Sequence, residues 1–216
     1  MLHVHAFTFN GFQENTYLIS DDETNECIVI DPGCSNANED KVLLDFIKNQ
    51  KLRPVRLLNT HCHIDHVLGN QLIHDEFQLE LEAHQLEKTV LASGLQVSQM
   101  YGIPYKGSPE IKVFLEEGEK IKFGSHEFDI LLTPGHSPGS LCFYNAVHKI
   151  LIGGDVLFLG SIGRTDLPGG DYDTLMGSIS TKLLPLPDDV VVYSGHGPKT
   201  SIGYERNHNP FLTTFR

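Results

Sequence analysis

Histidine and aspartate side chains gather in one short stretch of the chain, His61-Cys62-His63-Ile64-Asp65-His66. Imidazole nitrogens and carboxylate oxygens are donors that transition metals accept, and zinc is bound by both. A regular strand would turn His66 away from the other three donors, and a helix would also scatter them. We therefore expect the stretch to lie on a loop between a strand and a helix, held by a rigid sheet. The chemistry that it predicts is metal binding.

Three more donors stand where a predicted strand meets a turn that contains glycine. His136 lies in Thr133-Pro134-Gly135-His136-Ser137-Pro138-Gly139, Asp155 follows Gly153-Gly154, and His196 lies in Gly195-His196-Gly197. Glycine lets backbone segments approach closely at such turns. If these strand ends lie at one rim of a sheet, the donors meet, and together they suffice for two metals when one carboxylate bridges. Catalytic metal sites also keep one position open for water.

The elements that must position these donors follow from the hydrophobic pattern. Strands are expected at 2–9, 15–20, 27–30, 54–59, 78–83, 111–115, 119–123, 126–133, 140–145, 148–153 and 189–194. Helices are expected at 39–51, about 66–77, 84–99 and 171–184. No linker or low-complexity tract divides the chain, so we expect a single domain over residues 1–216. The order of elements predicts an α/β architecture of two mixed sheets with helices outside.

Composition excludes several classes of partner. The 216 residues carry 28 acidic against 16 basic side chains, a formal net charge of −12. Nucleic acid and anionic membranes are polyanions that need clustered Lys and Arg, so we expect a small-molecule substrate instead. No apolar run approaches the roughly 18 residues of a membrane span, and no secretory signal is visible. We predict a cytoplasmic protein, and the sequence does not specify an oligomeric state.

Cysteines do not contribute to the predicted metal chemistry. They are far apart and form no C-x-x-C pair, so neither a zinc knuckle nor a disulfide scaffold is indicated. We expect them to be small buried residues. The four are Cys27, Cys34, Cys62 and Cys142.

Taken together, these motifs resemble the metallo-β-lactamase superfamily. The resemblance extends to Asp31-Pro32-Gly33, to Ile162-Gly163-Arg164-Thr165-Asp166, and to the turn around His136. Near the end, Gly195-His196-Gly197-Pro198-Lys199-Thr200 and Asn209-Pro210-Phe211 are similar to the compact glyoxalase II-like hydrolases. The resemblance covers nearly the whole chain. It implies the fold of that superfamily, an αβ/βα four-layer sandwich of two mixed β-sheets with outer helices.

The resemblance also implies a set of metal ligands. It assigns one metal to His61, His63 and His136, and the other to Asp65, His66 and His196, with Asp155 bridging. Two divalent ions are expected, zinc first, although the same nitrogen and oxygen donors also accept iron or manganese. Asp31 is expected to orient the loop that carries the first donors, as metal ligands commonly require.

The activity implied by the resemblance is hydrolysis of a thioester such as S-lactoylglutathione. Hydroxide bridging the two metals would attack the carbonyl carbon, with Asp65 and Asp155 as catalytic residues. Arg164 and Asp166 are expected to form an ion pair that shapes the pocket, and Tyr172 to reach the substrate. Asp171 is expected to cap a helix.

Other branches of the superfamily offer alternatives. A persulfide dioxygenase holds a single iron with groups that match His61, His136 and Asp155, but has Asp-Tyr after its final histidine. The run His196-Gly197-Pro198 here favours the two-metal hydrolase. Lactone hydrolases share the nucleophile, whereas β-lactamases with a cysteine ligand place it where Asp155 stands.

Full-length glyoxalase II enzymes add a C-terminal helical domain that helps to bind glutathione. About 20 residues follow His196, too few for a bundle of helices. We therefore expect that domain to be missing here, and the thiol carrier stays open.

Overall fold

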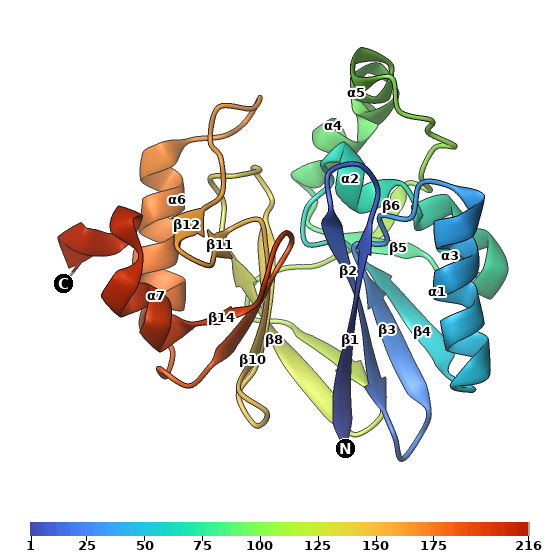
Figure 1. Cartoon of the computed structure of the whole chain (residues 1–216), viewed down its shortest axis with the longest axis horizontal. Helices are drawn as coiled ribbons and strands as arrows, with labels where there is room; N and C mark the ends of the chain where they lie inside the picture. The colour runs from blue at the N-terminus through green and yellow to red at the C-terminus, as the bar shows by residue number, and fades with distance from the viewer. Residues whose placement is uncertain (216) are drawn as a thin grey trace. The chain divides into compact units, whose positions relative to one another are not determined.

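The computed structural model describes residues 1–215, which divide into two compact units. The first contains Met1–Leu115 and Lys122–Glu127, and the second contains Glu116–Ile121 and the chain from Phe128 onward. Each unit is built on one mixed β-sheet with helices (Figure 1). The single domain expected from the sequence remains a prediction.

The first unit holds a six-stranded sheet in the order β1-β2-β3-β4-β5-β6. The first three strands pair antiparallel, and the pairs from β3 to β6 are parallel. The strands are β1 (Leu2–Phe9), β2 (Glu14–Asp21), β3 (Glu26–Ile30), β4 (Arg53–Leu58), β5 (Leu81–Ala83) and β6 (Ile111–Phe114). The helices are α1 (Ala37–Asn49), α2 (Ile64–Val67), α3 (Asn70–Phe77), α4 (Glu87–Ala92) and α5 (Gly94–Tyr101).

Helices α1 and α3 lie beside this sheet (Figure 1). Leu43 and Ile47 of α1 and Ile73 of α3 pack with Val29 and Leu57 of the sheet in one buried cluster. Burial of such side chains contributes about 1.5–3 kcal/mol each. The cluster makes the carboxyl ends of β3 and β4 a rigid support for the segments that follow them.

The second unit contains most of the sheet β14-β13-β10-β9-β8-β7, and the parts of β7 and β8 that lie within Lys122–Glu127 are assigned to the first unit. Strands β10 and β13 pair parallel, whereas β8–β9, β9–β10 and β13–β14 pair antiparallel. The strands are β7 (Lys120–Phe123), β8 (His126–Leu132), β9 (Leu141–Asn145), β10 (Ile150–Gly154), β13 (Val191–Ser194) and β14 (Thr200–Ser201). A small ribbon pairs β11 (Leu157–Phe158) with β12 (Ser161–Ile162).

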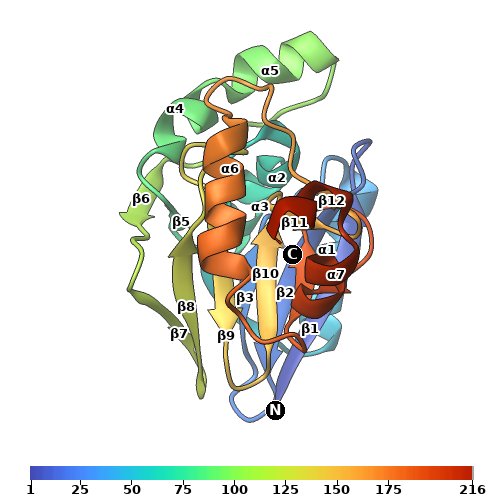
Figure 2. The same cartoon turned by 90° about the vertical axis from the view of Figure 1, so that its left-hand side faces the viewer.

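Helices α6 (Tyr172–Ser178) and α7 (Ile202–His208) cover one face of the second sheet (Figures 1 and 2). A π-helical turn, Ile179–Leu183, continues α6, and a 3-10 helix, Pro210–Phe215, follows α7. Leu175, Ile179 and Ile202 are buried against Leu151 and Val192. Among the helices of residues 1–215, none combines the length and the apolar character that crossing a bilayer requires.

Most predicted strands and helices are present with slightly shifted ends, but two predicted helices are wrong as single elements. The helix expected at 66–77 is split into α2 and α3, and the one at 84–99 into α4 and α5. At Gly69, the backbone N–H donates to Pro32 O at 2.7 Å, and a Cβ would lie 2.4 Å from Cys34 Sγ. The break between α2 and α3 therefore lets the chain pack closely on the segment after β3. Strands β11, β12 and β14 and helix α7 were not predicted.

Candidate metal centre

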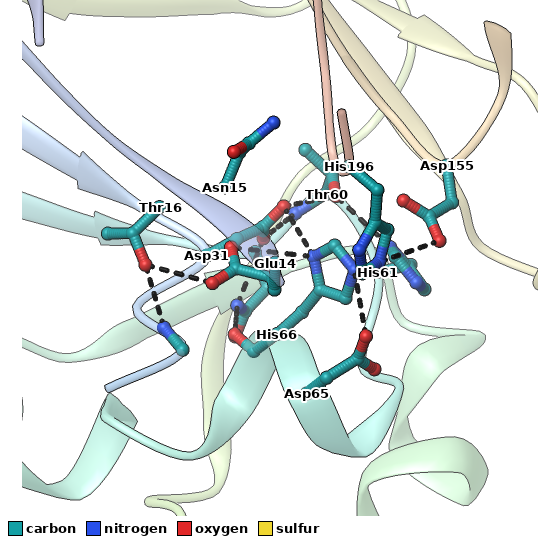
Figure 3. A network of polar contacts seen from close by, with 12 residues as sticks. Glu14, Asn15, Thr16, Asp31, Thr60, His61, Asp65, His66, Asp155 and His196 are labelled. Carbon is teal, nitrogen blue, oxygen red and sulfur yellow. Dashed lines mark hydrogen bonds and ion pairs between the residues drawn. The ribbon is translucent and has the colours of Figure 1, made fainter. Parts of the chain in front are cut away.

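The first donors lie where β4 meets α2. His61 and His63 follow the end of β4, but α2 begins at Ile64, so Asp65 and His66 lie on its first turn. The prediction of a loop is therefore wrong for Asp65, whereas His66 lies where a helix was expected to begin. The ring centroid of His61 lies 4.8 Å from that of His63 and 4.2 Å from that of His66. One short connection thus gathers the donors of the first unit (Figure 3).

Hydrogen bonds orient two of these imidazole rings. Asp31 Oδ2 lies 3.2 Å from His66 Nδ1 and accepts a bond from Thr60 Oγ1 at 2.6 Å (Figure 3). Thr60 Oγ1 gives its hydrogen to Asp31, so at 3.1 Å from His61 Nδ1 it accepts. Both rings therefore carry their proton on Nδ1, which makes Nε2 the nitrogen with the lone pair that a metal requires.

Asp31 lies beside two of the candidate ligands and is itself held by several hydrogen bonds. Asp31, His61 and His66 place ligand atoms within 4.8 Å of one another. However, Asp31 Oδ1 accepts from Asn59 Nδ2 at 3.1 Å and from Thr60 N at 2.7 Å, and its side chain is 1% exposed. Its φ of 50° lies in the left-handed region, which a short polar side chain tolerates best. The orienting role of Asp31 stays a prediction.

Backbone contacts fix the remainder of the connection. Asn10 Nδ2 donates to Gly33 O at 2.9 Å and to Asp65 O at 3.0 Å. Glu87, buried on α4, accepts from Cys62 N at 2.7 Å. Gly33 has no room for a side chain, because a Cβ would lie 2.6 Å from Asp65 O. Hydrogen bonds to distant segments thus hold both ends of the ligand stretch, the residues from His61 to His66.

A second buried carboxyl group lies beside His66. Glu14 is fully buried, its Oε2 accepts from Thr16 Oγ1 at 3.0 Å, and its Oε1 lies 3.9 Å from His66 Nδ1. Burial raises the pKa of Glu14 well above its ordinary value, although the neighbouring His66 opposes that shift.

The second unit gathers the other donors around one carboxylate. Asp155 Oδ2 lies 3.6 Å from His136 Nε2 and 3.5 Å from His196 Nε2. His136 is 2% exposed, whereas the His196 side chain is 26% exposed. His136 Nδ1 lies 2.7 Å from Arg164 O, so this ring too carries its proton on Nδ1 and aims Nε2 toward Asp155.

Glycines allow the close packing of these turns. At Gly163 a Cβ would lie 1.9 Å from Asp155 O and 3.2 Å from His136 Cβ. At Gly135, where φ is +128°, it would lie 2.3 Å from Leu175 N of α6. The turn that carries His136 is therefore pressed onto α6, and the segment before Arg164 is pressed onto Asp155.

The remaining predicted residues lie on the exposed part of the second unit. Two 2.7 Å hydrogen bonds join the Arg164 guanidinium to the Asp166 carboxylate, and the bond from Arg164 lowers the pKa of Asp166 to about 2. Asp171 accepts from Thr174 N, which confirms the predicted helix cap, and Tyr172 is 48% exposed. The four cysteines are buried with free thiols, as expected.

Sequence reasoning missed the residues that support the donors. The main ones in the first unit are Asn10, Glu14, Asn59, Asn70 and Glu87. Asn59 alone carried a signal, since it is a polar residue at the end of a buried strand and directly precedes the ligand stretch. Asn70 follows His66 by four residues without any such signal, and Asn10, Glu14 and Glu87 come from segments farther away in the sequence.

Comparisons with known proteins match almost the whole chain. The family model of the metallo-beta-lactamase superfamily matches residues 9–196. Hydroxyacylglutathione hydrolase GloC of Haemophilus influenzae is 40% identical over 216 residues, 99% of each chain. The crystal structure of BLEG-1 B3 metallo-beta-lactamase is similar with a TM-score of 0.88 and 36% identity, covering 98% of this chain and 100% of that one. The crystal structure of TTHA1623 in a di-iron-bound form is similar with a TM-score of 0.87 and 36% identity, covering 97% of this chain and 100% of that one.

These similarities confirm the predicted fold class, since the two mixed sheets with helices have metallo-β-lactamase neighbours along nearly the whole chain. The clusters around His66 and Asp155 supply the histidine and aspartate donors that divalent metals need. The chain therefore belongs to the metallo-β-lactamase superfamily and is a metal-dependent hydrolase of that superfamily.

Proposed function

We propose that this hydrolase cleaves thioesters of a low-molecular-weight thiol, with S-lactoylglutathione as its model substrate. The observation that carries the proposal is the orientation of His61, His66 and His136, whose Nδ1 atoms each lie against an oxygen. Such rings present Nε2 to a metal before any metal binds. The similarity to hydroxyacylglutathione hydrolase GloC over 99% of both chains supports the choice of substrate.

We assign two divalent metals to the donors of both units. The proposed ligands of one are His61, His63 and His136, those of the other are Asp65, His66 and His196, and Asp155 is shared. The donor chemistry fits, because imidazole and carboxylate suit zinc, iron and manganese alike. One Asp155 oxygen with two Nε2 atoms at 3.6 and 3.5 Å is consistent with a shared carboxylate. Zinc is our first choice, and the di-iron form of TTHA1623 is the reason to test iron.

Metals held by these residues would supply hydroxide at neutral pH and would polarise a carbonyl oxygen. The chain's own residues prepare that chemistry. Asp31 and Thr60 hold the imidazole rings in one tautomer, and Asp65 is assigned to accept a hydrogen bond from the attacking oxygen. A carbon–oxygen bond forms, the carbon–sulfur bond breaks, and the electron pair leaves on sulfur. Because free thiols have a pKa near 8.5, the thiolate needs little acid assistance.

The proposal is tested by assaying S-lactoylglutathione beside other small thioesters, a lactone and a β-lactam. Metal content is measured on the same preparation. We expect thioester turnover and about two metals per chain. Asp155→Ala should lower kcat/KM roughly 10²–10³-fold and reduce the metal content, while the protein stays folded. Asp173→Ala, which removes an exposed carboxylate from the first turn of α6, is the matched control. It should keep the wild-type kcat/KM and the wild-type metal content.

Other outcomes would redirect the assignment. One iron per chain with oxygen uptake on a persulfide would contradict hydrolysis and favour a dioxygenase. Faster turnover of the lactone or the β-lactam than of every thioester would keep the hydrolase but reject the thioester.

A further inference from the structure

Asn59 stands between the end of β4 and the ligand stretch, and it is fully buried. Its Nδ2 donates to Asp31 Oδ1 at 3.1 Å and to His66 O at 2.9 Å. Its Oδ1 accepts from Asn70 Nδ2 at 2.7 Å. Every side-chain hydrogen of Asn59 is therefore used on the residue that orients His66 or on the backbone of His66 itself.

These contacts link Asn59, Asp31 and His66 in one closed hydrogen-bond network. Asn59 binds the Asp31 carboxylate through one oxygen, and the other oxygen lies 3.2 Å from His66 Nδ1. Asn59 also binds the carbonyl of His66. The ring is thus fixed both at its backbone and at Nδ1, which leaves the direction of Nε2 little freedom. A side chain that merely filled space would need neither bond.

Asn70 supplies the donor to the oxygen of the Asn59 amide. Asn70 is fully buried at the start of α3, and its Nδ2 also donates to Ser108 Oγ at 2.9 Å. Asn70 donates to Asn59 and to Ser108 through the same side-chain nitrogen, so the oxygen of Asn59 faces a donor. Its nitrogen is then committed to Asp31 and to His66 O, both of which only accept.

We propose that Asn59, oriented by Asn70, is a positioning residue that holds His66 and Asp31 in the geometry needed for metal binding. This inference rests on the ligand role of His66 in the proposed function. It extends that function by naming the support of the ligand. Partners behind metal ligands typically change metal affinity 10–100-fold when removed.

Substitutions at 59 separate shape from hydrogen bonding. Asn59→Asp keeps the size but turns an oxygen toward the Asp31 carboxylate and the His66 carbonyl, so both contacts become repulsive. Asn59→Ala removes the contacts without adding charge. Asn70→Ala leaves Asn59 in place but removes the donor to its buried oxygen, which weakens the hold on the amide. Asn145→Ala is the matched control, because Asn145 is also buried and supports a turn of the second unit by accepting from His148 N at 2.7 Å.

The experiment titrates each metal-free protein with Zn²⁺ against a chelator and measures the melting temperature of the same metal-free samples. We expect the dissociation constant of one site to rise about 10–100-fold in Asn59→Asp. Smaller rises should follow in Asn59→Ala and then Asn70→Ala. Asn145→Ala should lower the melting temperature and keep the wild-type affinity. If Asn59→Asp does not fold, the two alanine variants decide.

His66→Ala, titrated in parallel, separates the two hypotheses. Wild-type affinity in His66→Ala would remove the ligand assignment, and the positioning role with it. Weakened binding in His66→Ala together with wild-type affinity in Asn59→Ala and Asn70→Ala would overturn the positioning role alone. The positioning role would also be overturned if Asn59→Ala and Asn145→Ala showed the same loss of metal affinity for the same loss of melting temperature. Asn59 would then be merely structural.

Discussion

In the first unit the candidate ligands follow one another in the chain and are oriented by buried side chains, whereas in the second they come from three separate turns. His66 is held through Asp31 and Asn59, so its position depends on polar side-chain atoms. His136 is held by the backbone carbonyl of Arg164, and Asp155 lies under the backbone of Gly163. The first arrangement should fail when a polar atom is lost, and the second when a methyl group is added.

The largest expected effect is that of Gly163→Ala. The new Cβ would lie 1.9 Å from Asp155 O, a backbone atom that can move only with its strand end. Overpacking of this kind typically costs about 1–3 kcal/mol, so the free energy of unfolding should fall by that amount. Asp155 should shift with it, and the metal content should drop. Urea unfolding and metal analysis on one preparation measure both changes.

Gly177→Ala is the matched control in the same unit. Gly177 lies in α6, where an added Cβ meets nothing within 4 Å. An alanine in a helix should stabilise the protein by roughly 0.5–1 kcal/mol and leave the metal content unchanged. If Gly163→Ala behaved like this control, close backbone packing would not be what positions Asp155.

An intermediate effect concerns how the stability of the protein depends on pH. Besides Asp31, the first unit contains another buried carboxylate, Asp21, which lies outside the candidate metal centre. Burial by itself would raise the pKa of Asp21, but hydrogen bonds from Glu23 N, Ser125 and Thr24 bring it down to about 2. The folded state therefore holds this proton more weakly than the unfolded state, whose ordinary value is 3.8. Stability from Asp21 is complete above about pH 4 and is lost as the pH falls toward 2.

Asp21→Asn isolates this contribution. In metal-free protein, the variant should take up as much as one proton fewer on unfolding between pH 4 and pH 2, which is the expected linkage for one carboxylate. Urea midpoints measured across that range should therefore decline less steeply in the variant. Equal slopes in the two proteins would mean that Asp21 is not a source of acid sensitivity.

The same contrast explains how much of the centre could be predicted from sequence. In the contiguous motif from His61 to His66, the spacing alone predicts the metal donors. Glycines beside His136, Asp155 and His196 indicate strand ends and so predict the other three. The polar supports are different. Glu87 reaches Cys62 N from 25 residues away, and Asn10 reaches Asp65 O from 55 residues away. No local sequence pattern predicts a hydrogen bond between residues so far apart in the chain.

Element boundaries failed for a related reason. The hydrophobic spacing from His66 to Phe77 is helical throughout, and Gly69 is the residue in it with the lowest helix propensity. The break arises because the backbone there packs on Pro32 and Cys34. Tertiary packing thus decided that the helix breaks at this glycine, and the hydrophobic spacing alone could not show it.

The smallest expected effect is that of Arg164→Ala, and it examines the second arrangement most directly. The side chain pairs with Asp166, but both groups are largely exposed, at 57% and 68%, and such pairs contribute about 0–1 kcal/mol. His136 Nδ1 binds the backbone carbonyl of Arg164, which the substitution keeps. Stability should therefore change by less than about 1 kcal/mol, and metal content should stay at the wild-type level. Should the guanidinium bind an anionic substrate, KM would rise while kcat stays the same. Loss of metal in Arg164→Ala would instead mean that the side chain, and not the backbone, holds His136, and the two units would then position their ligands in the same way.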